Sequence, residues 1–130
     1  MRIEEYFRKI EEAIQSYAII QLSEVTFEKR GSHEGFIRGT LTFLDSSMLH
    51  FREYVDVEVG SDRLMYVYHY TDSSNHFIFR YDNTGHHKMV GLPTHPHHKH
   101  EESESNVLAS NAPNLNTVLE EIGMRVEFPK

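Results

Sequence analysis

Residues 49–82 read LHFREYVDVEVGSDRLMYVYHYTDSSNHFIFRYD, and much of this stretch alternates polar and apolar side chains. A two-residue period is typical of β-strands with one buried face, and it indicates strands at 49–59, 64–71 and 76–82. The segments between them contain glycine, serine and asparagine, which suit tight turns. The stretch therefore predicts an antiparallel meander.

The alternation sorts the side chains of these strands onto two faces of the sheet. A two-residue turn in the first hairpin would place Glu53 opposite Tyr68. The same turn length in the second hairpin would place Val67 opposite Arg80. The predicted apolar face holds Leu49, Phe51, Val55, Val57, Leu64, Tyr66, Tyr68, Tyr70, Phe77, Phe79 and Tyr81. The predicted polar face holds His50, Arg52, Tyr54, His69, Arg80 and Asp82.

Glu53 is the exception in this pattern, because its position puts a carboxyl group on the apolar face. A buried carboxylate requires hydrogen-bond or charge partners, or else protonation, and the tyrosine hydroxyl of Tyr68 is the candidate partner. Alternatively, Glu53 lies near an edge of the sheet, or a β-bulge turns it toward solvent.

The remaining elements flank this meander. Apolar residues at helical spacing predict an amphipathic helix over 2–15, and β-rich segments follow at 17–29 and 36–44. A second helix is expected over 115–122, between an N-capping asparagine and a glycine, with a last short strand over 124–128. The fold class is therefore α+β: an antiparallel sheet of five to six strands, with an N-terminal and a C-terminal helix on one face.

Length and composition limit the classes of protein that fit. The chain has 130 residues, enough for one domain over 1–130, and its 12% aromatic content can build a core. It has no cysteine, which excludes disulfides and thiolate chemistry. No apolar leader or membrane segment is visible, so we expect a cytoplasmic protein. The net charge of −7 argues against a general nucleic-acid binder but allows a local phosphate site.

The segment 83–112 breaks the strand pattern and is expected to be a long loop. Six histidines lie within fifteen residues of it: His86, His87, His95, His97, His98 and His100. A loop of this length is usually functional or disordered. It follows directly on Arg80 and Asp82, and the whole region is therefore the candidate site.

Three interpretations of the histidines remain open. As metal ligands, His95, His97, His98 and His100 would bind zinc or nickel with Asp82, although their spacing matches no established zinc motif. As general acids and bases, histidines would move protons at an RNA phosphodiester, while Arg80 and Lys99 hold the phosphate and Tyr68 is among the tyrosines that could stack on bases. The third interpretation is a solvated polar loop without chemistry.

Several motifs resemble those of the TumE-type toxin family. They are Phe77-Ile78-Phe79-Arg80-Tyr81-Asp82-Asn83, then His86-His87, and finally Pro96-His97-His98-Lys99-His100. Thr84-Gly85 stands where that family commonly has Ala-Pro, which alters the start of the loop.

The resemblance implies a toxin of a type II toxin–antitoxin system with a DNA-binding antitoxin as its partner. A ribonuclease activity follows by analogy with other small toxins. The site residues carried over by the motifs are Arg80, Asp82, His86, His87, His97, His98 and His100. Glu53 and His69 join them from the analysis of the two faces. No cofactor is required, RNA is the expected substrate, and a homodimer stays open.

Two other functions remain as alternatives. A protein without enzymatic activity would bind a basic partner through the acidic face of the first helix, formed by Glu4, Glu5, Glu11 and Glu12. A hydrolase that depends on a histidine-bound metal is the other alternative.

Overall fold

The computed structural model describes residues 1–60, 62–83, 98–101, 107–109 and 113–126. At 62, 98, 100 and 107–109 the description covers the backbone alone. The elements are α1 (Ile3–Gln15), β1 (Ile20–Lys29), β2 (Glu34–Phe43), β3 (Met48–Asp56), β4 (Asp62–Thr71), β5 (Phe77–Asp82), β6 (His98–Glu101), β7 (Val107–Ala109) and α2 (Leu115–Gly123).

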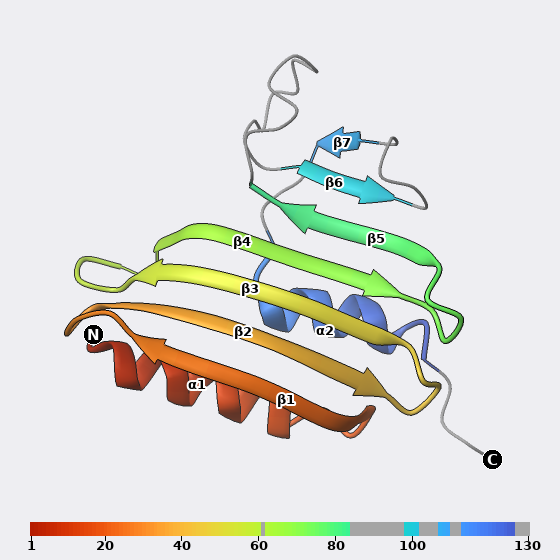
Figure 1. Ribbon diagram of the computed structural model, residues 1–130, viewed down its shortest axis with the longest axis horizontal. Coiled ribbons are helices and arrows are strands. Elements are labelled where there is room, and N and C mark those ends of the chain that lie inside the picture. The colour runs from red at the N-terminus through yellow and green to blue at the C-terminus, as the bar shows by residue number, and fades with distance from the viewer. Residues whose placement is uncertain (61, 84–97, 102–106, 110–112, 127–130) are drawn as a thin grey trace.

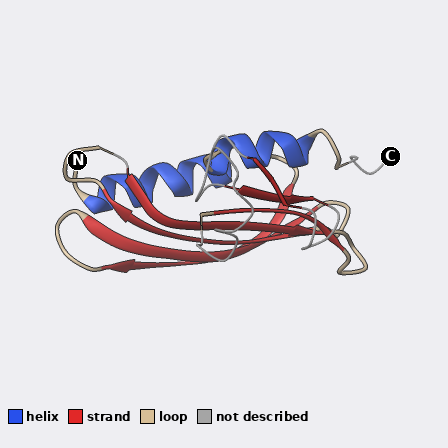
Figure 2. Ribbon diagram, turned by 90° about the horizontal axis from the view of Figure 1, so that it is seen from above, coloured by secondary structure: helices blue, strands red, loops and turns tan. Residues whose placement is uncertain are grey.

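The strands form one open antiparallel sheet in which each strand pairs with the next one along the chain (Figure 1). Within the described ranges the sheet has seven strands, in the order β1 to β7. Both helices lie on the same face of the sheet (Figure 2). The predicted α+β class, the meander and the placement of the helices are confirmed.

The expectation that 83–112 is entirely loop is wrong, because β6 and β7 lie within it. The sequence of β6, His-Lys-His-Glu, has no apolar residue to indicate a strand. Pairing with β5 forms the strand instead, and Lys99 lies opposite Tyr81. The Lys99 ammonium is 4.9 Å from the centroid of the Tyr81 ring and 3.6 Å from Glu121 of α2, so tertiary contacts outweigh local propensity.

The predicted register of both hairpins is wrong by two residues. Glu53 pairs with Tyr66, and Val67 pairs with Asp82. The turns are longer than two residues, since the first hairpin closes at the pair Asp56–Asp62. A shift of two residues preserves the side-chain period, and most residues therefore keep the predicted face.

A β-bulge in each hairpin moves one of the predicted core residues out of the core. In the first hairpin Tyr54 pairs with Met65 but Val55 pairs with Arg63, so Leu64 is the extra residue and is 55% exposed instead of buried. In the second hairpin Phe77 lies against His69 of the open face, with ring centroids 5.2 Å apart, and not in the core as predicted. Bulges of this kind depend on loop geometry and have no signature in the alternation.

The core lies between the sheet and the two helices. The buried helix residues are Ile3, Ile10 and Ile14 of α1 and Leu115, Val118, Leu119 and Ile122 of α2. The side chain of Asn114 accepts a hydrogen bond from the Thr117 amide at 2.9 Å, which confirms the predicted N-cap. The start of α1 packs directly on the β2 backbone at Gly35, where a Cβ would lie 2.5 Å from Phe7.

Replacing Gly35 by alanine should destabilise the protein by about 1–3 kcal/mol, because the added methyl group forces α1 away from β2. Gly60→Ala is the matched control, since nothing lies within 4 Å of a Cβ at that position. Its effect should stay within about 0.5 kcal/mol. Urea denaturation followed by circular dichroism measures both. Equal stability of the two variants would contradict this packing.

Candidate functional site

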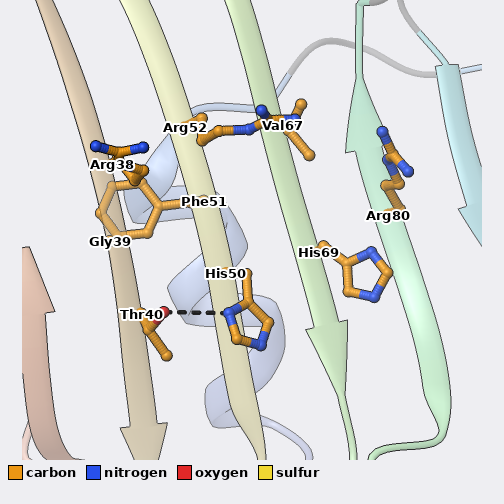
Figure 3. A pocket seen from close by; sticks show the side chains of 9 residues that line it. All are labelled: Arg38, Gly39, Thr40, His50, Phe51, Arg52, Val67, His69 and Arg80. Atoms are coloured by element: carbon orange, nitrogen blue, oxygen red, sulfur yellow. Dashed lines mark hydrogen bonds between the residues drawn. The ribbon is translucent and has the colours of Figure 1, made fainter.

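The face of the sheet opposite the helices carries a depression of about 430 Å³. Its lining comes from the four neighbouring strands β2 to β5 (Figure 3). The lining residues are Arg38, Gly39, Thr40, His50, Phe51, Arg52, Val67, His69 and Arg80. The strand register arranges the polar ones in two rows that run across the sheet.

The first row contains the two histidines of the depression. It runs from Thr40 through His50 and His69 to Arg80, each paired with the next across neighbouring strands. The Thr40 hydroxyl and His50 Nδ1 are hydrogen-bonded at 3.1 Å, which orients that imidazole (Figure 3). The ring centroids of His50 and His69 are 6.4 Å apart, and Phe77 supports the second ring. Two imidazoles and a guanidinium therefore lie side by side.

The second row contains two of the three arginines of the depression. It runs through Arg38, Arg52, Val67 and Asp82. Asp82 is fully buried, and its Oδ2 lies 3.0 Å from Nε of Arg80, so the carboxylate orients this guanidinium. Three arginines and no acidic residue are among the described residues lining the depression, although the whole chain carries −7. The depression is therefore a local cationic surface on an acidic protein.

The strand β6 extends both rows at the level of the backbone. His98 pairs with Asp82, and His100 pairs with Arg80. The predicted site residues His86, His87, His95 and His97 lie outside the described residues. Of the predicted set, the structure brings His69, Arg80 and Asp82 together with the backbone of these two histidines.

Three basic residues of the lining were not predicted as site residues, namely Arg38, His50 and Arg52. His50 and Arg52 were placed on the polar face by their period, but no motif marked them. Arg38 comes from β2, and the alternation of polar and apolar residues does not fix the register of β2 with β3. The available signal was the set of polar residues that alternate with apolar ones along β2 and β3. The strand β3 lies next to β4, and β2 lies next to β3, so these polar residues share the open face with His69.

Glu53 lies on the opposite, helix-covered side of the sheet and is fully buried. Its Oε2 accepts a hydrogen bond from the candidate partner Tyr68 at 2.6 Å, and its Oε1 accepts one from Tyr6, so the alternative of a solvent-facing Glu53 is wrong. Arg63 donates to the Tyr68 hydroxyl at 3.1 Å and to the Pro113 carbonyl at 2.6 Å, just before α2. This network joins the sheet to both helices.

The electrostatics of the network keep its hydroxyl groups protonated. Burial, followed by the charge of Glu53, raises the pKa of Tyr68 well above its ordinary value, and the same causes raise the pKa of Tyr6. Burial also raises the pKa of Tyr66, to about 12. The Tyr6 and Tyr68 hydroxyls therefore remain donors to Glu53 throughout the physiological range of pH.

Lys99 also lies on the helix side, away from the depression. Its ammonium is 3.3 Å from Glu101 and 3.6 Å from Glu121, and the Tyr81 hydroxyl donates to Glu121 at 2.6 Å. Glu53, Tyr68 and Lys99 are thus separated by the sheet from His69 and Arg80, with which they were grouped as predicted site residues.

The described residues contain neither a candidate metal centre nor a helix that could span a membrane. No group of three or more histidine, aspartate or glutamate side chains gathers there as a metal site would require. The predicted ligands His95 and His97 fall outside the described ranges. No helix within them is long and apolar enough to cross a membrane.

The comparison with known protein families covers most of the chain. The family model of toxin TumE matches residues 10–126, from the middle of α1 to just beyond α2. The chain belongs to the toxin TumE family. Neither the curated proteins nor the solved structures contain a significant match. Membership confirms the resemblance seen in the sequence and implies an antitoxin as partner.

Removing the Tyr68 hydroxyl with Tyr68→Phe should destabilise this TumE-family protein by about 1–3 kcal/mol, because the buried Glu53 carboxylate loses a donor. The matched control is Tyr54→Phe. Its hydroxyl donates to Glu34 at 2.9 Å on the open side, and its loss should cost less than about 0.5 kcal/mol. Chemical denaturation compares the two. A Tyr68→Phe protein as stable as the control would mean that the network does not support the fold.

Proposed function

We propose that this TumE-family toxin cleaves RNA on the open face of its sheet by histidine acid–base catalysis, without a required metal. The observation that carries the proposal is the row in which His50, His69 and Arg80 occupy adjacent strands, inside a depression bordered by Arg38 and Arg52. These residue types are the ones that bind a phosphate and move protons near neutral pH.

The arginines provide the binding part of the proposal. Arg38 and Arg52 are exposed and attract the RNA backbone, while Arg80, oriented by Asp82, holds the phosphate that reacts. Guanidinium groups bind phosphate oxygens in a bidentate manner and stabilise the charge that develops on them. Binding to a charged backbone is weakened by salt, in proportion to the number of phosphates contacted.

The reaction has two proton transfers. One imidazole takes the proton of the ribose 2′-hydroxyl, whose oxygen then attacks phosphorus and forms a new P–O bond. The bond from phosphorus to the 5′-oxygen breaks, and a second, protonated imidazole gives that oxygen its proton. The products are a 2′,3′-cyclic phosphate and a 5′-hydroxyl, so neither a metal nor water enters this step.

His69 is our first candidate for one of the two imidazoles, because it is paired with Arg80. The second comes from His50, at 6.4 Å between ring centroids, or from the motif histidines. The motif histidines in question are His87, His97, His98 and His100. Glu53, Tyr68 and Lys99 have a structural role in this proposal, because all three lie on the helix side.

The setting of the proposal is a type II toxin–antitoxin system. The toxin would act on RNA in the cytoplasm, and a DNA-binding antitoxin would neutralise it. The family assignment supports this setting.

His69→Ala should abolish growth arrest on induced expression and lower the rate of RNA cleavage by about 10²–10⁴-fold, the usual contribution of one acid or base. His76→Ala is the matched control, because this histidine lies in the exposed β4–β5 turn, beside Asp72. It should retain both activities. Thermal melts of both variants exclude unfolding as the cause. Full toxicity and cleavage in a folded His69→Ala protein would rule out this role for His69.

A further inference from the structure

The outer edge of β1 is a long stretch of sheet without a neighbouring strand in the described part of the chain. β1 spans ten residues and pairs on one side only, with β2 (Figure 1). Such an edge presents unpaired backbone donors and acceptors to any extended chain that fits against it. The edge is therefore suited to strand addition.

One hydrogen bond establishes which residues face this edge. The amide of Arg30 donates to the carbonyl of Glu34 at 2.9 Å, at the end of the β1–β2 hairpin. Hydrogen-bonded and non-hydrogen-bonded pairs alternate in an antiparallel ladder, so Glu24 and every second residue between it and Arg30 bond to β2. The odd-numbered residues Ser23, Val25, Phe27 and Lys29 form the other set and direct their N–H and C=O groups outward.

A groove lies beneath the edge, between β1 and α1. It has a volume of about 290 Å³, and Val25, Phe27 and Ile14 form its apolar part. The Val25 and Phe27 side chains are half-buried, because α1 covers them on one side only. A strand added to β1 would point every second side chain into this groove and complete their burial.

The charges around the edge select the partner. Glu11 lines the groove on the α1 side, and Glu24 stands on the open face of β1. Neither of them forms an ion pair with another described residue, whereas Glu28 is paired with Arg30 at 3.2 Å. The flanks of the edge therefore carry two carboxylates that take part in no ion pair among the described residues, and these favour a basic segment.

We propose that the β1 edge docks an extended segment of the antitoxin, in which apolar side chains that enter the groove alternate with basic ones that stand beside Glu24. Backbone hydrogen bonds to Ser23, Val25 and Phe27 give the affinity, and the alternation gives the specificity. The inference rests on the family assignment and not on RNA cleavage. Its test measures binding, and an inactive open face would leave the result unaffected.

Ser23→Pro tests the backbone contact, because proline removes an outward-facing donor and no bond to β2. The probe is the antitoxin encoded next to the toxin gene, titrated into the full-length toxin by calorimetry. We expect the affinity to fall about tenfold. The matched control Ser23→Ala keeps the amide and should bind like the wild type. Equal affinities of two folded variants would overturn the proposal.

Amide hydrogen exchange of the wild-type protein tests the edge without any substitution. In the complex, the amides of Ser23, Val25 and Phe27 should become protected, whereas the inward-facing amide of Glu24 is protected in both states. Exchange of the outward-facing amides that stays as fast in the complex as in the free toxin would overturn the proposal. These amides could also be protected in the toxin alone, to an extent that increases with toxin concentration. That result would overturn the proposal as well, because a second copy of the chain would then occupy the edge.

Discussion

The two helices cover only one face of the sheet, and this constraint assigns every strand residue either to a dry core or to an open surface. Side chains alternate between the faces, so a single strand supplies both environments at once. In β3, Phe51 packs in the core while its neighbours His50 and Arg52 line the depression. The cationic site is therefore built on the side of the sheet that faces away from the hydrophobic core.

The buried Glu53 shows that a polar group on the core side of the sheet needs hydrogen-bond partners. Its carboxylate is compatible with full burial because two tyrosine hydroxyls donate to it, and Arg63 extends the network to the backbone before α2. The network fixes the position of both helices relative to β3 and β4. These two strands carry His50 and His69 on their open side. A contact in the core thus helps to position the proposed chemistry on the other face.

The two-residue period of the sequence was enough to predict on which face of the sheet most strand residues lie. The polar parity of His69 and Arg80 was predicted correctly even though the register was wrong by two, because such a shift does not change faces. Loop length and bulges were not predictable from the period, and Leu64 and Phe77 lie outside the core for that reason. The strand β6 was missed because its residues are polar and only tertiary contacts, such as those of Lys99, select the extended form.

Only part of the candidate site could be predicted, because most of its residues come from different strands. Arg80 and Asp82 stand in a family motif, whereas Arg38 and His50 are distant in sequence and meet through the register of β2, β3 and β4. Only the sheet brings these residues together. The histidine motif predicted a site in 83–112. In the structure the backbone of His100, which lies in this segment, pairs with Arg80 and continues the row of His50, His69 and Arg80.

The location of RNA on the molecule is the most direct test of this account. Chemical-shift mapping by NMR, with a short RNA whose 2′-hydroxyls are methylated and which therefore resists cleavage, reports contact residue by residue. The largest shifts should fall on His50, His69 and Arg80, in the middle of the open face. Shifts confined to the helices, or an RNA that leaves the spectrum of the folded protein unchanged, would contradict it.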